Sequence, residues 1–119
     1  MERPIAGLRL NATPPNEPTQ QIEVQIGLPV QVGPDEWVCP VELKGLYESM
    51  QLRGGDALQA LGLAMRLSLS LLKAFKDGGG TLQYVPSEHR SDPPGSLDIP
   101  LEAYGLSLMD LSARPDRPA

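Results

Sequence analysis

Few side chains in this sequence could carry out chemistry, because it contains one cysteine, Cys39, and one histidine, His89. A cysteine thiolate beside an imidazole is a nucleophile with its general base, the pair that a small hydrolase or transferase would use. The two residues are fifty positions apart, and Cys39 shares one side of an alternating segment with Trp37 and Val41. A buried, inert thiol is typical of that position. We therefore predict that Cys39 and Trp37 pack in the core, and an enzyme that uses Cys39 and His89 is the alternative hypothesis.

Metal-binding and acid–base sites are not indicated either. One His and one Cys would need carboxylate ligands, and no two candidate ligands recur at the i, i+3 or i, i+4 spacing that places side chains on one helix face. None of the fifteen Asp and Glu residues stands in an apolar strand interior, where burial would raise its pKa. We therefore assign no catalytic, cofactor-binding or metal-binding residue and no cofactor.

The run Arg53-Gly54-Gly55-Asp56 has the glycines of an anion-binding turn. It lacks the Lys-Ser/Thr ending of a phosphate-binding loop, and the Asp56 carboxylate would itself occupy the positive end of a following helix. Helix capping explains the run better, since Asp56 is a good N-cap and Gln59 follows three residues later, as a capping box requires. The run therefore predicts a helix that begins at Asp56.

Composition and charge narrow the class of protein. The 119 residues suffice for one modest core, and the net charge of −5 disfavours nucleic acid and anionic membranes as partners. Polar residues interrupt the apolar stretch 57–75, which argues against a membrane span. The N-terminus lacks the basic and apolar regions of a secretory signal, and a single cysteine suits a reducing compartment, so we expect a cytoplasmic protein.

Two segments, 22–32 and 37–43, show the two-residue alternation of half-buried strands. The turn-forming residues 33–36 lie between them, so we predict an antiparallel hairpin, with a bulge or an edge position near Gly27 and Pro29. The alternation places one set of the first segment on the inward face: Ile22, Val24, Ile26, Leu28, Val30 and Val32.

Shorter apolar runs at residues 6–10 and 81–85 predict two more strands. The helix should run to about Lys76, where the glycines 78–80 can close its last turn. The predicted fold class is α+β: a small antiparallel sheet of three to four strands packed against one long helix, with a proline-rich C-terminal segment. We expect a single core domain at residues 1–86 and an extension at residues 87–119.

The predicted helix has more apolar surface than one small sheet can cover. Its polar positions form one narrow stripe, at Gln59, Arg66, Ser70 and Lys73. Two apolar flanks remain, and the sheet should cover one of them. The other either receives the C-terminal residues Leu97, Ile99, Leu101, Leu106 and Leu108 or meets a second copy of the chain. We expect the homodimer, because prolines make the first arrangement hard to specify.

A family resemblance joins several of these features. The chain contains Trp37-x-Cys39, then Gly45-Leu46, and then Gly54-Gly55-Asp56-Ala57-Leu58-Gln59-Ala60-Leu61 with Ala64. A W-x-C strand followed by a G-x-D-x-x-Q-A-L helix start resembles small uncharacterised bacterial proteins, a family of unknown function, over about residues 22–76. The resemblance implies a cytosolic bacterial protein with a small antiparallel sheet packed on one long helix. It supplies no activity, cofactor or catalytic residue.

These observations favour a non-enzymatic protein-binding or interaction module over an enzyme. Its binding surface would be the sheet face or the surplus apolar flank of the helix. An immunity-type protein that neutralises a toxin is a second hypothesis, which rests on small size and acidic charge alone.

Overall fold

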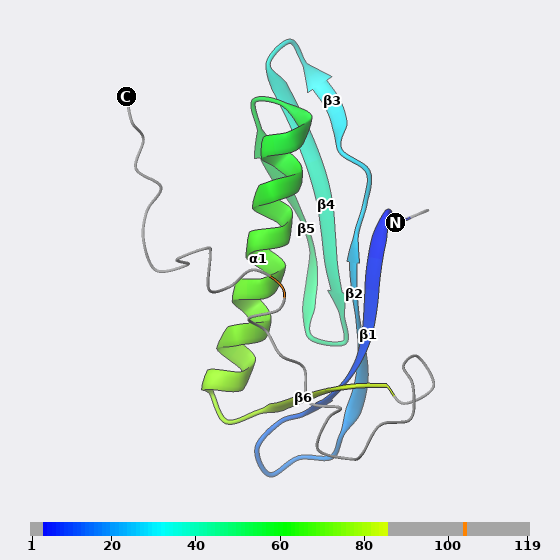
Figure 1. The fold of residues 1–119 in the computed structure, drawn as a ribbon, viewed down its shortest axis with the longest axis vertical. Helices are drawn as coiled ribbons and strands as arrows, with labels where there is room; N and C mark the ends of the chain where they lie inside the picture. The colour runs from blue at the N-terminus through cyan, green and yellow to red at the C-terminus, as the bar shows by residue number, and fades with distance from the viewer. Residues whose placement is uncertain (1–3, 86–103, 105–119) are drawn as a thin grey trace.

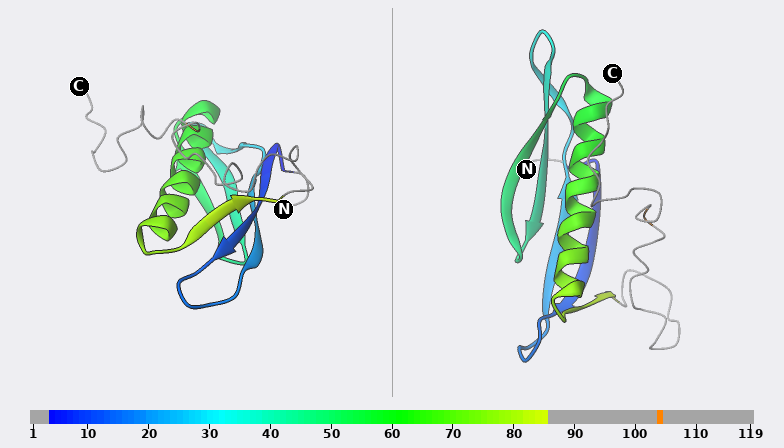
Figure 2. Two further views of the ribbon diagram at one scale, coloured as in Figure 1. Left: turned by 60° about the horizontal axis from the view of Figure 1, so that its bottom comes forward. Right: turned by 90° about the vertical axis from the view of Figure 1, so that its left-hand side faces the viewer.

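One antiparallel sheet carries one helix on a single face, as Figures 1 and 2 show. The computed structural model describes residues 4–85 and Tyr104. The predicted boundary between residues 1–86 and 87–119 lies outside the described residues. In chain order the elements are β1 (Ala6–Thr13), β2 (Gln20–Ile26), β3 (Val30–Gly33), β4 (Glu36–Lys44), β5 (Tyr47–Gly54), α1 (Ala57–Asp77) and β6 (Thr81–Tyr84).

β4 is the central strand of the sheet. One edge of β4 pairs with β2 and then with β3, and its other edge pairs with β5. Beyond β2, the sheet continues with β1 and ends with β6. The α+β class, the single long helix and the antiparallel sheet are thus confirmed. The predicted hairpin is also present, since β3 and β4 pair across the turn at residues 33–36.

The expectation of three to four strands is wrong, because the described residues form a sheet of six. β5 was not predicted. Only Met50 and Leu52 of this strand pack against the core, and most of its other residues are exposed, so its apolar signal is weak. The second difference is that the predicted strand 22–32 is divided into β2 and β3.

The division of that strand has a consequence for its side chains. Ile26 pairs with Val41, and Val30 pairs with Val38, so four steps along β2 and β3 match three steps along β4. One extra residue between Gly27 and Val30 is a β-bulge, which moves every later side chain to the opposite face of the sheet. The bulge near Gly27 and Pro29 is therefore confirmed.

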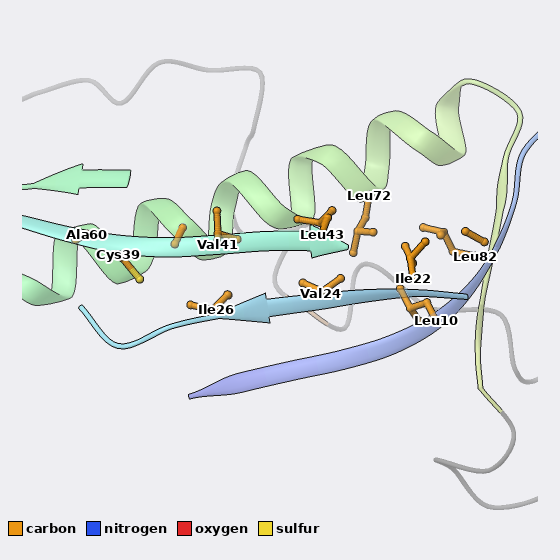
Figure 3. Packing of buried hydrophobic residues seen from close by; sticks show 12 residues of the cluster. Leu10, Ile22, Val24, Ile26, Cys39, Val41, Leu43, Ala60, Leu72 and Leu82 are labelled. Carbon is orange, nitrogen blue, oxygen red and sulfur yellow. The ribbon is translucent and has the colours of Figure 1, made fainter. Parts of the chain in front are cut away.

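The same bulge overturns the expected burial of three residues. Val30 now shares the face away from α1 with Val38, its cross-strand neighbour on β4. The prediction of inward positions is wrong for three side chains, whose exposed fractions are 62% for Leu28, 50% for Val30 and 53% for Val32. It is correct for Ile22, Val24 and Ile26, which are buried on the face of the sheet that carries α1 (Figure 3).

Both ends of α1 have the structures that the sequence predicted. At the start, Gln59 N donates to Asp56 Oδ1 at 2.8 Å, and Gln59 Oε1 accepts from Gly55 N at 2.5 Å. The returning bond thus reaches one residue further back than in a standard capping box. At the end, Gly79 adopts a φ of 101°, and the backbone bonds from Gly79 to Lys76 and from Gly80 to Phe75 form a Schellman motif.

The N-cap makes a measurable contribution to stability. We expect Asp56→Ala to lower the free energy of unfolding by about 1 kcal/mol, because the amide of Gln59 loses its acceptor in the first turn. Urea denaturation of the two proteins measures the difference. Asp56→Asn, which keeps an acceptor oxygen, should restore most of the loss. An unchanged midpoint for Asp56→Ala would contradict this role.

α1 packs chiefly on β4 and β5. Its small residues Ala60 and Ala64 are completely buried, which lets the helix lie close to the sheet. By length and composition alone, α1 could also cross a membrane. The core helix of a soluble protein passes the same test, and five residues of α1 are buried here, so the expectation of no membrane partner stays a prediction.

Candidate functional site

Cys39 lies in the core, as the sequence predicted. It is completely buried on the face of β4 that packs against α1, and its thiol donates to the carbonyl oxygen of Gly27 at 3.4 Å. Burial raises the pKa of the Cys39 thiol, so the reactive thiolate is disfavoured. His89 lies outside the described residues. The other expected core residue, Trp37, is partly buried and packs against the same cluster.

We expect the Cys39 thiol to be unreactive in the native protein. It must first be exposed by opening of the sheet or helix, so labelling should follow unfolding and not the intrinsic reactivity of a thiol. Reaction with a chromogenic disulfide reagent, with and without denaturant, measures both rates. Rapid labelling of the folded protein would revive the hypothesis that Cys39 is a nucleophile.

The charged side chains and the Gly55 amide of the run at residues 53–56 are engaged within the protein, since Gly55 N donates to Gln59 Oε1. The Arg53 guanidinium forms an ion pair with the Glu36 carboxylate of the neighbouring strand β4, and Asp56 caps α1. Among residues 4–85 and Tyr104, no group of three or more His, Cys, Asp or Glu side chains could hold a metal ion. Capping is therefore the structural role of Asp56.

A polar hollow of about 270 Å³ lies over β1, β2 and the end of β4. Arg9, Glu23 and Lys44 line it, and the sheet register places Glu23 opposite both basic residues. Opposite charges alternate across these strands, which is typical of a solvated sheet surface. This hollow therefore has no strong preference for a ligand of either charge.

An apolar groove lies between α1 and the first two strands, and we call it the helix–strand groove. Because α1 packs chiefly on β4 and β5, it leaves part of β1 and β2 without helix cover. The cavity measures about 290 Å³. Its strand wall includes Ile5, Leu8 and Val24, and its helix wall includes Leu61, Met65 and Leu69.

Tyr104 is the one described residue of the C-terminal segment, and it lines this groove. Its hydroxyl lies 2.6 Å from that of Tyr84 on β6, so the two phenols share a hydrogen bond. Burial, together with the contact with Tyr84, raises the pKa of Tyr104. The aromatic ring thus occupies apolar surface while its polar atom has a partner. Nothing in the sequence around Tyr104 marks it as an anchor, so this contact was not predicted.

A second apolar surface follows the outer edge of the sheet, and we call it the β3 strip. It consists of Leu28, Val30 and Val32, which are exposed. Among the described residues, β3 pairs only with β4, so its other edge presents unpaired backbone groups. The turn that joins β3 to β4 lies beyond the N-terminal end of α1 (Figures 1 and 2). In the sequence, Gly27 and Pro29 indicated a bulge at this point. A bulge turns the side chains that follow it to the opposite face of the sheet, and this exposes the strip.

Comparison with protein families finds a match over most of the chain. The family model for a domain of unknown function, DUF6968, covers residues 9–91, which is more than half of the chain and contains the whole described sheet and helix from Arg9 onward. The expected membership of a family of unknown function is confirmed. Neither the curated proteins nor the solved structures give a match.

Proposed function

We propose that this chain, which belongs to the DUF6968 family of domains of unknown function, is a non-enzymatic protein-binding module. The observation that carries the proposal is the β3 strip. Leu28, Val30 and Val32 lie within five positions of each other, each is at least half exposed, and no charged residue stands between them. Monomeric proteins usually protect such an edge with lysine or cover it with another element.

The strip fits a partner that adds a strand to the sheet. Strand addition joins the free backbone edge of β3 to an extended segment, and the exposed valines supply apolar contacts beside those hydrogen bonds. The bulge before Val30 interrupts the strand on one side, and the register of β3 with β4 shifts again between Gln31 and Gly33, so that only a short length of edge is offered. A brief, apolar edge of this kind favours a partner with a short strand of similar composition.

A second copy of the chain is the partner that we propose first. Antiparallel pairing of two β3 strands about Gln31 would set Val30 of each copy opposite Val32 of the other, without like charges facing each other. We choose β3 over the expected helix flank because Tyr104 already lies in the groove beside that flank. A basic toxin is a further candidate partner, since the net charge of −5 would attract it.

The enzyme alternative has less support among the described residues. A hydrolase or transferase based on Cys39 would need an accessible thiol with a lowered pKa, whereas this thiol is buried and its pKa is raised. A cytoplasmic location and a bacterial source stay predictions.

Sedimentation equilibrium at micromolar concentration tests the dimer. We expect a dimer mass for the wild type and a monomer mass for the double variant Val30→Lys/Val32→Lys, because lysine blocks edge-to-edge pairing. The matched control is Leu58→Lys, which changes an equally apolar side chain with an exposed fraction of 78% on α1. That variant should remain dimeric.

A monomeric wild type would exclude the second copy but not another protein. In that case a photo-cross-linking residue at position 32, in cells that contain the natural partners, should give a single discrete adduct. The same residue at position 58 should not give it. Equal adducts from both positions, or none, would contradict the proposal that β3 is a binding surface.

A further inference from the structure

The helix–strand groove is incomplete in the described residues. Leu69 and Leu72 are buried at its base, while Met65 and Ile5 at its rim have exposed fractions of 44% and 48%. A groove of about 290 Å³ with this lining offers no charged side chain to a polar ligand. Its occupant must therefore be apolar.

Tyr104 identifies the source of that occupant. It reaches the groove from the C-terminal part of the chain, nineteen positions beyond Val85, and its hydroxyl is bonded to Tyr84 on β6. The residues next to Tyr104 in the sequence are covalently tied to this anchor. Fully extended chain covers at most about 3.6 Å per residue, so Leu101 and Leu106 lie within roughly 11 Å of Tyr104.

The composition of the flanking sequence matches the groove. Between residues 97 and 111 large aliphatic side chains recur, at Leu97, Ile99, Leu101, Leu106, Leu108, Met109 and Leu111. These side chains can contribute the apolar contacts that the groove needs. A tethered segment has an effective concentration of about millimolar, roughly a thousandfold above that of a second copy at micromolar concentration. Docking within one chain is therefore favoured over docking between chains.

We propose that the helix–strand groove is the docking site for the chain's own segment 97–111, anchored by Tyr104. The segment covers the part of the exposed α1 flank that includes Met65, whereas Leu58, which does not line the groove, stays outside it. The groove is thereby closed to other apolar partners, and the β3 strip, on a different part of the sheet, is unaffected.

Thiol labelling in the full chain tests this docking. In the variant Met65→Cys, the new thiol lies at the groove rim, and the wild type, whose only thiol is Cys39, provides the background rate. We expect the further changes Leu101→Asp and Leu106→Asp to raise the labelling rate at position 65 roughly tenfold, because they displace the segment. The control is Leu58→Cys, whose thiol lies on the same helix but does not line the groove, and its rate should not change.

Tyrosine ionisation gives a second, independent measurement. In the docked state Tyr104 should ionise above the ordinary tyrosine pKa of about 10, and Tyr104→Phe should remove this late step from the absorbance titration. The raised pKa means that the contribution of the neutral Tyr104 hydroxyl to docking is fully present below about pH 10 and is lost as the pH rises through the raised value. Leu101→Asp/Leu106→Asp should move the late step back toward the ordinary range.

Two results would overturn the proposal. If the labelling rate at position 65 is the same with and without the aspartates, the segment does not cover the groove. If protection at position 65 rises with protein concentration, the segment docks on a second copy and not within its own chain. Neither result bears on the β3 strip, because Val30→Lys/Val32→Lys should leave labelling at position 65 unchanged.

Discussion

Leu43→Ala is expected to lower the free energy of unfolding by about 2–5 kcal/mol. Leu43 is completely buried on β4, where it pairs with Val24 of β2, and Figure 3 shows it between β2 and α1 near Leu72. Alanine would leave a cavity beneath the helix, and the paired strands and the helix around it can collapse only in part. Urea denaturation followed by circular dichroism measures the loss.

The control for this variant is Leu28→Ala, which removes the same atoms from a side chain with an exposed fraction of 62%. It should change the free energy of unfolding by less than about 0.5 kcal/mol if the protein is studied as a monomer. Equal losses for the two variants would mean that Leu28 is buried in the native protein. A negligible loss for Leu43→Ala would place the core elsewhere.

Gly54→Ala is expected to destabilise the protein by about 1–3 kcal/mol, because the added methyl group would overpack the contact between β5 and α1. A Cβ atom at Gly54 would lie 2.6 Å from the backbone nitrogen of Ala60 and 3.1 Å from its Cα. These atoms belong to the helix backbone, so relief requires movement of the first turn of α1. The N-cap at Asp56 lies in that turn, and its hydrogen bond should weaken as well.

Gly62→Ala is the matched control on the same helix. Beyond its own turn of the helix, a Cβ atom there would meet nothing within 4 Å, so alanine should stabilise the helix by about 0.5–1 kcal/mol through its higher helix propensity. Thermal or urea denaturation of the two variants should therefore give shifts of opposite sign. Stabilisation by Gly54→Ala would show that β5 and α1 do not approach so closely.

Local signals in the sequence determined α1 almost completely. The cap at Asp56, the glycines after Asp77 and the narrow polar stripe are all features of residues a few positions apart, and each acts within one or two turns. The β3–β4 hairpin was predictable for the same reason, since the turn and the alternation are neighbours in the chain. The inward position of Cys39 followed from that alternation.

The tertiary structure decided which faces the later residues occupy. One extra residue before Val30 reverses which side chains of β3 face α1 and which face solvent. The exposure of Leu28, Val30 and Val32 therefore depends on how β3 pairs with β4. The sequence of β3 alone does not contain this pairing. β5 is stabilised by pairing with β4 and by contact with α1, so its own weak apolar pattern did not predict it.

The groove and its anchor also depend on contacts between distant residues. The sequence predicted that α1 has a surplus apolar flank, and the exposed Leu58 and Met65 confirm it. The position of α1 over β4 and β5 decides where that flank lies in the structure. The hydrogen bond between Tyr84 and Tyr104 likewise joins residues that are twenty positions apart in the chain. Local periodicity specifies which side chains of an element are apolar, whereas the partner that covers them is chosen by packing among all the elements at once.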